Sequence, residues 1–205
     1  MPVKIEVMIE NIHALISHFL QQQKTISLAN ADQLAASERH TKAGVVPFMR
    51  TQPHQFHFMK PGSKITGLTE ATFQICKGTR MHFVPGTGWR DIRDSKNKME
   101  LKETLVQTAL REGVEELGLK LGNIAKLIEL GTYHFSSATT GKDKEMWLYA
   151  AEMVNQSNFL PDSEIASSTA AREWMTAAQF TSAGREDHRY ILKDITSKLY
   201  EIYKE

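Results

Sequence analysis

The chain has 205 residues, a formal net charge of +1 and 41% hydrophobic residues, a composition typical of soluble globular proteins. The near-neutral charge excludes a general attraction for nucleic acid or anionic membranes. The single cysteine excludes an intrachain disulfide, and no apolar run is long enough for a transmembrane helix. Glu6, Glu10 and Asn11 interrupt the apolar N-terminus, which excludes a secretory signal. We therefore expect a cytoplasmic protein.

The first 40 residues predict an N-terminal helical extension. Residues 2–22 carry apolar side chains at intervals of three to four, the pattern of an amphipathic helix. Residues 29–37 predict a second short helix, with Asn30 or Ser27 as its cap. Two interpretations of this extension stay open. It is either a helix packed on the domain, or an extension used for dimerisation or at the substrate side.

Residues 41–205 predict one domain that contains both strands and helices. Its strands are expected at residues 43–50, 55–59, 72–76, 125–135, 145–153 and 172–175, and a closing amphipathic helix is expected from residue 187 onward. The first two strands should pair as a hairpin, and so should the two long strands around the turn at residues 136–142. Residues 154–170 are polar and predict a loop.

The densest chemical pattern lies at residues 111–119, at the end of a helix predicted from residue 103. At about 100° per residue, Glu112 and Glu116 are one turn apart, and Glu115 lies close on the same side. Three carboxylates are thus crowded opposite the apolar stripe. From these residues alone, two interpretations stay open. The cluster is either a solvated acidic face or a set of oxygen ligands for a hard divalent cation.

The fixed order of these residues favours the second interpretation, because it resembles the box of the Nudix hydrolases, G-x5-E-x7-R-E-U-x-E-E-x-G-U, where U is a bulky aliphatic residue. The matching positions are Glu103, Arg111, Glu112, Glu115, Glu116, Gly118 and Leu119. Two positions depart from the pattern. Gly113 stands in place of the first aliphatic residue, and Asn97 stands six residues before Glu103 where the pattern has glycine.

Gly78 offers a better match for the box glycine, because Lys77 and Gly78 follow the strand predicted at residues 72–76. The spacer would then have grown to the 24 residues 79–102. We expect this insert to be a loop, either a functional lid or a tolerated surface insertion. Its Trp89, if exposed, could stack on a nucleotide base.

The resemblance covers about residues 43–200. It implies an α+β fold, an α/β/α sandwich with a mixed β-sheet. It also implies hydrolysis of a pyrophosphate bond in a nucleoside diphosphate linked to another moiety, with Mg²⁺ or Mn²⁺ as cofactor. A dinucleoside polyphosphate is one candidate substrate, because the K-G dipeptide is similar to that branch of the family. The alternative is a non-catalytic Nudix-like module that binds a nucleotide or a protein partner.

The resemblance also implies roles for individual residues. Glu112 and Glu116 are metal ligands, Glu115 is a further ligand or binds through water, and the Gly78 carbonyl completes the set. Glu103 pairs with Arg111 and holds the register of the helix.

For the substrate itself, Lys77, Arg50 and Trp89 are candidate contacts, and Glu164 is a weak candidate for the general base. We expect the eight histidines to be structural or surface residues, because none stands at metal-ligand spacing. We expect a small nucleotide-type substrate, no membrane attachment and no nucleic-acid binding, and homodimer formation is left open.

Overall fold

A computed structural model of the chain describes residues 3–62, 72–92, 101–136, 141–161, 165 and 169–204. In chain order its elements are α1 (Val3–Gln22), β1 (Ile26–Ser27), α2 (Ala31–Ala35), η1 (Ser37–Arg39), β2 (Lys42–Met49), β3 (Gln55–Pro61), β4 (Cys76–Thr79), β5 (Met81–Val84), β6 (Gly88–Asp91), β7 (Leu101–Lys102), α4 (Leu105–Glu112), η3 (Gly113–Leu117), η4 (Leu121–Asn123), β8 (Ile124–Ser136), β9 (Asp143–Met153), β10 (Thr169–Thr176), α5 (Ala177–Ala183) and α6 (Glu186–Tyr203).

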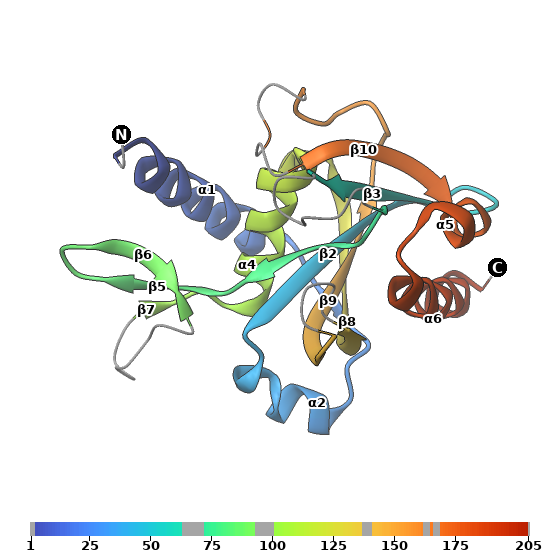
Figure 1. The fold of residues 1–205 in the computed structure, drawn as a ribbon, viewed down its shortest axis with the longest axis horizontal. Coiled ribbons are helices and arrows are strands. Elements are labelled where there is room, and N and C mark those ends of the chain that lie inside the picture. The colour runs from blue at the N-terminus through green and yellow to red at the C-terminus, as the bar shows by residue number, and fades with distance from the viewer. Residues whose placement is uncertain are drawn as a thin grey trace.

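A seven-stranded mixed sheet forms the centre of the molecule (Figure 1). The strand order is β1-β8-β9-β2-β3-β10, and β4 pairs with β2 beside β3. The β1–β8 and β2–β9 pairs are parallel, and the other pairs are antiparallel. Helices α1 and α4 lie on one side of the sheet, and α5 and α6 lie on the other. The expected sandwich, with its mixed sheet and N-terminal helix, is confirmed.

The two largest hydrophobic clusters lie between these layers. Because side chains alternate along a strand, neighbouring residues of β2 belong to different clusters. Val46 faces α6 and packs with Leu192 and Ile195, whereas Val45 faces α4 and packs with Leu110. Strand β2 is therefore the central element against which both helical layers are placed.

The leader is packed into the second cluster. The apolar side chains of α1 that face the domain are buried beside those of α4, and they are Ile12, Ile16 and Phe19. Helix α2 begins at Asn30, whose side chain accepts a hydrogen bond from the Gln33 N–H, so one of the two predicted caps is used. The described residues thus agree with a helix packed on the domain, and the boundary at residue 40 stays a prediction.

The expected loop over residues 79–102 is wrong for the residues that the structure describes there. Strands β5, β6 and β7 form a second, three-stranded sheet that extends away from the main one (Figure 1). The Pro-Gly-Thr-Gly run is the turn of its hairpin, and both Gly86 and Gly88 have positive φ angles, 79° and 75°. In the sequence this turn resembles a loop, because the strands on either side of it have only four residues each.

Three further elements differ from the sequence-based expectation. Strand β4 begins only at Cys76, so Lys77 and Gly78 lie within a strand and not after one. Helix α5 was not predicted, although Thr176 and Gln179 form a capping box at its start. Strand β1 was also not predicted.

Part of the turn predicted at 136–142 lies outside the described residues. Among the helices of the described ranges, none is long and apolar enough to span a membrane.

Candidate active site

The acidic segment consists of two kinds of helix. Thr104 caps α4 in a capping box with Gln107. From Gly113 the backbone widens into the π-helical turn η3, which ends at Gly118 in a left-handed conformation with φ of 69°. The predicted stop at Gly118 is confirmed, whereas the predicted uniform α-helix is not. Single π-helical turns inside α-helices are frequent at functional sites.

Gly113, the departure from the box pattern, has a steric explanation. A Cβ atom built on this residue would lie 2.8 Å from Cγ1 of Val45 and 3.0 Å from Cδ2 of Leu119. Its φ of −60° is ordinary for any residue, so glycine is needed for space and not for backbone conformation. The absent side chain allows the acidic helix to approach β2 closely.

We expect Gly113→Ala to destabilise the protein by about 1–3 kcal/mol, the usual cost of inserting a group into a packed core. For a chain of this size, that corresponds to a decrease in Tm of roughly 2–4 °C per kcal/mol. Gly122→Ala is the matched control, because a Cβ there meets nothing within 4 Å. Thermal unfolding followed by circular dichroism measures both variants. Equal Tm values would contradict the steric explanation.

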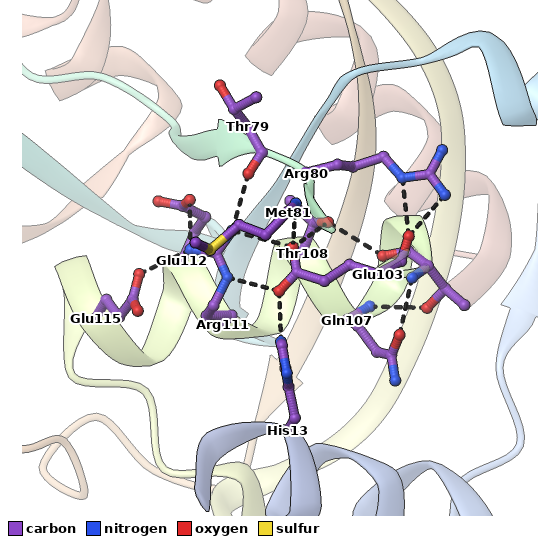
Figure 2. A network of polar contacts seen from close by, with 11 residues as sticks. His13, Thr79, Arg80, Met81, Glu103, Gln107, Thr108, Arg111, Glu112 and Glu115 are labelled. Carbon is purple, nitrogen blue, oxygen red and sulfur yellow. Dashed lines mark hydrogen bonds and ion pairs between the residues drawn. The ribbon is translucent and has the colours of Figure 1, made fainter. Parts of the chain in front are cut away.

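Arg111 is the centre of the polar network shown in Figure 2. It is only 3% exposed. Its Nη1 donates to Glu112 at 2.7 Å and to Glu115 at 2.8 Å. Its Nη2 donates to the Thr79 carbonyl of β4 at 2.9 Å. One guanidinium thus joins the helix to the strand and offsets the repulsion between two of the crowded carboxylates.

Glu103 holds Arg111 from the other side (Figure 2). Its buried carboxylate accepts from Arg111 Nε at 2.7 Å, so the pair implied by the resemblance is present. It also accepts from His13 Nε2 at 2.5 Å, from the Met81 N–H at 2.9 Å and from Thr108 Oγ1 at 3.0 Å. Burial alone would raise the pKa of Glu103, but the hydrogen bonds from His13 and Arg111 lower it to about 2. Glu103 is therefore ionised at neutral pH.

Glu116 and Glu112 contact β4, the strand that carries Gly78. The Cys76 thiol lies 3.5 Å from Glu116 Oε2. A Cβ on Gly78 would lie 1.8 Å from the carboxyl carbon of Glu112, so any side chain at position 78 would occupy the place of that carboxylate. Burial, together with the charge of Glu112, raises the pKa of Glu116 to about 7.

These residues fit a hard divalent cation by the chemistry of their donors. Two of the three carboxylates, Glu112 and Glu116, lie against β4, and burial together with the charge of Glu112 raises the pKa of Glu116. Within the described ranges, however, no group of three metal-binding side chains is already arranged around a common point. Glu112 and Glu115 face Arg111, and Glu116 faces Cys76. A bound ion would have to compete with these contacts.

The raised pKa of Glu116 predicts a stability effect in the absence of divalent metal. Between the unfolded value of 4.5 and the folded value of about 7, the folded state binds more protons, so the free energy of unfolding decreases as the pH rises. Glu116→Gln removes the titrating carboxyl group, so the free energy of unfolding of the variant no longer decreases through this group as the pH rises. With EDTA present, the Tm of the variant relative to wild type should therefore be higher at pH 8 than at pH 5. A difference that does not change with pH would contradict this.

Lys77 lies on the opposite face of the sheet from Gly78, because neighbouring residues of a strand alternate. Its ammonium is 5.1 Å from the centre of the Phe135 ring and 3.3 Å from Gln74 Oε1. Burial and the nearby Arg185 lower the pKa of Lys77 to about 8. The structure thus places Lys77 beside the acidic cluster in sequence but across the sheet in space.

The structure places the other two candidate substrate contacts, Arg50 and Trp89, against the rings of Tyr203 and His13. Arg50 follows the end of β2 that is distant from Gly78, and it lies over the Tyr203 ring at 4.3 Å. Ala43 is the residue of β2 that pairs with Gly78, and seven residues of strand separate Arg50 from it by about 23 Å. Trp89 is only partly exposed, and its ring contacts His13 edge to face at 4.3 Å. The role of Arg50 and Trp89 as substrate contacts stays a prediction.

Three contributions to the site were not predicted: the His13 side chain, the Thr79 carbonyl and the Met81 N–H. His13 was assigned with the other histidines to structural or surface positions. It is separated from Glu103 by 90 residues, so no local pattern signals the contact. Glu164, the weak candidate for the base, lies outside the described residues.

A comparison with protein families identifies the chain. A sequence model described as the NUDIX domain matches residues 80–195, more than half of the chain. The chain belongs to the Nudix family. The match contains the whole acidic segment, residues 103–119, which carries the pattern of the Nudix box. Comparison with curated proteins returned no match.

Solved structures of other Nudix proteins share the fold. A Caenorhabditis elegans Ap4A hydrolase in a binary complex has a TM-score of 0.52 and 16% identity, covering 78% of this chain and 97% of that one. The NUDIX domain of Shewanella oneidensis NrtR with ADP ribose has a TM-score of 0.52 and 16% identity, covering 84% and 99%. A NUDIX hydrolase from Nitrosomonas europaea has a TM-score of 0.51 and 14% identity, covering 77% and 90%. At such identities, the likeness shows the fold alone.

Proposed function

We propose that this Nudix protein is a divalent-metal-dependent hydrolase that cleaves a pyrophosphate bond in a nucleoside diphosphate linked to another moiety. The observation that supports it most directly is the contact between the box and β4. The carboxylate of Glu112 fills the space that a side chain on Gly78 would take. The box carboxylate and the β4 backbone are thus close neighbours, which supports a site built from oxygen donors of both, as magnesium prefers.

In this proposal Glu112, Glu115, Glu116 and the Gly78 carbonyl hold Mg²⁺ or Mn²⁺. When bound, the ion neutralises phosphate charge and lowers the pKa of the attacking water. Arg111 orients two of the glutamates and reduces their mutual repulsion. Glu103, fully ionised, keeps Arg111 in place. The glutamates alone would repel a polyphosphate, so the substrate requires the loaded site.

A dinucleoside polyphosphate is the substrate that we would test first. The K-G dipeptide in β4 supports this choice, and so does the fold shared with an Ap4A hydrolase. ADP-ribose is the next candidate, because it was crystallised with the NUDIX domain of NrtR. The cytoplasmic location, homodimer formation and the absence of nucleic-acid binding stay predictions from the sequence.

The test is a substrate panel with Glu116→Gln as the control. Dinucleoside polyphosphates, nucleotide sugars, ADP-ribose and nucleoside triphosphates are incubated with Mg²⁺ or Mn²⁺, and nucleotide products are separated by chromatography. We expect one class to be hydrolysed by wild type only, and only with metal. If wild type and variant are both inactive on every class with either metal, the proposal fails.

The alternative is a Nudix module that binds a nucleotide without cleaving it. One observation favours it, namely that Arg111 already occupies the carboxylates of Glu112 and Glu115. Calorimetric titration of the protein with each nucleotide of the panel distinguishes the hydrolase from the binding module. Metal-independent binding that Glu116→Gln leaves unchanged, without turnover by wild type, would support the binding module.

A further inference from the structure

Two segments outside the Nudix box meet at its first glutamate. The leader helix α1 supplies His13 and the insert supplies the Met81 N–H, and both donate to Glu103. The Trp89 ring of the insert contacts His13. In Figure 2, the His13 side chain points from its helix directly at the Glu103 carboxylate. The family match begins at residue 80, so the contribution of α1 lies outside the matched domain.

The His13–Glu103 contact is a hydrogen bond between two side chains that are largely withdrawn from solvent. Nε2 and Oε1 are 2.5 Å apart. An ionised carboxylate can only accept, so His13 donates through Nε2. The histidine side chain is 12% exposed and the glutamate side chain is fully buried, which reduces competition from water.

Residues of α1 and of the insert also restrict the position of the His13 ring. On its own helix, the neighbouring Ile12 and the next-turn Ile16 are buried in the core. On the side of the insert, the Trp89 ring meets it edge to face, and Phe83 packs against Trp89 at 5.7 Å between centroids. The leader and the insert therefore fix the direction in which His13 donates.

We propose that His13 is a positioning residue of the active site, acting through Glu103 and Arg111 on the metal-binding glutamates. Glu103 Oε1 accepts from both His13 and Arg111 Nε. Arg111 in turn donates to Glu112 and Glu115. Loss of His13 removes one of the two donors that fix Glu103 Oε1 beside Arg111, while the donors from Arg111, Met81 and Thr108 remain. The catalytic part of this inference rests on the proposed function.

The experiment compares His13→Ala with His13→Gln and His18→Ala. Removal of a group that orients a ligand shell costs 10–100-fold in activity or metal affinity. We expect His13→Ala to lower kcat about tenfold, with KM for the nucleotide nearly unchanged and a higher Mg²⁺ requirement. His13→Gln should recover most of the activity, because its amide can donate at a similar reach. His18 is an exposed histidine on the same helix, and its replacement should change nothing.

A second measurement does not depend on turnover. Titration calorimetry with Mn²⁺ alone should show about tenfold weaker binding by His13→Ala than by wild type. If His13→Ala lowers Tm but keeps wild-type kcat and Mn²⁺ affinity, its role is purely structural and the inference is wrong. If wild type hydrolyses nothing but His13→Ala still weakens Mn²⁺ binding, the proposed function fails and the positioning role stands.

Discussion

Replacing Gly78 by alanine is expected to lower kcat about hundredfold, the loss that a displacement of about 1 Å at a reacting centre can cause. The added Cβ would lie 1.8 Å from the carboxyl carbon of Glu112, so that carboxylate must move. The clash involves only the end of a flexible side chain and no backbone. Tm should therefore change little, although hydrolysis and its metal requirement change strongly.

Steady-state kinetics on the substrate found in the panel, together with thermal unfolding, tests this separation of activity from stability. Gly122→Ala is again the control, because it adds the same methyl group in open space. If Gly78→Ala retains wild-type kcat and the wild-type Mg²⁺ requirement, the Glu112 carboxylate does not have to occupy the position seen here, and the metal site must be assigned elsewhere.

Replacing Arg111 by methionine is expected to lower the free energy of unfolding by about 3–5 kcal/mol, because it leaves buried charges without a partner. Glu103 would lose two hydrogen bonds from the guanidinium, and Glu112 and Glu115 would face each other without an intervening cation. At roughly 2–4 °C per kcal/mol, Tm should decrease by about 6–20 °C.

Arg90→Met is the matched control, since Arg90 is exposed in the hairpin of the insert, and its loss should cost no more than about 0.5 kcal/mol. The double variant Arg111→Met with Glu103→Gln should recover part of the stability, because the uncompensated carboxylate is then gone. A Tm for Arg111→Met within the error of wild type would show that the network contributes nothing to folding.

The sequence predicted those elements whose structure follows from a local pattern of residues. Strands β2, β3, β8 and β9 follow apolar or alternating runs, and α1 and α6 follow amphipathic ones, so their existence was predictable. The hairpin of the insert was missed because the Pro-Gly run was the most visible feature of the segment, whereas its flanking strands have only four residues each. Helix α5 is too short for its periodicity to stand out.

In the candidate site, too, some residues could be predicted from a local pattern and others could not. The box glutamates, Arg111 and Gly78 were named from their order and spacing, and the structure does bring them together. The sequence does not reveal on its own that Lys77 lies on the opposite face of β4 from Gly78, which follows from the alternation of side chains along a strand. Arg50 was named from its place at the end of the first strand and Trp89 from its place in the insert, but their surroundings depend on tertiary contacts with Tyr203 and His13. His13 depends entirely on such a contact.

The packing of α1 has a consequence for how the protein unfolds. Ile12, Ile16 and Phe19 share one core cluster with Leu105 and Leu110 of the acidic helix. Opening of the leader would expose that apolar surface and uncover the back of the helix that carries the glutamates. Loss of the first 20 residues, by proteolysis or by local opening, should therefore lower the cooperativity of unfolding and the order of the acidic segment together. Hydrogen exchange should report nearly equal protection for α1 and α4.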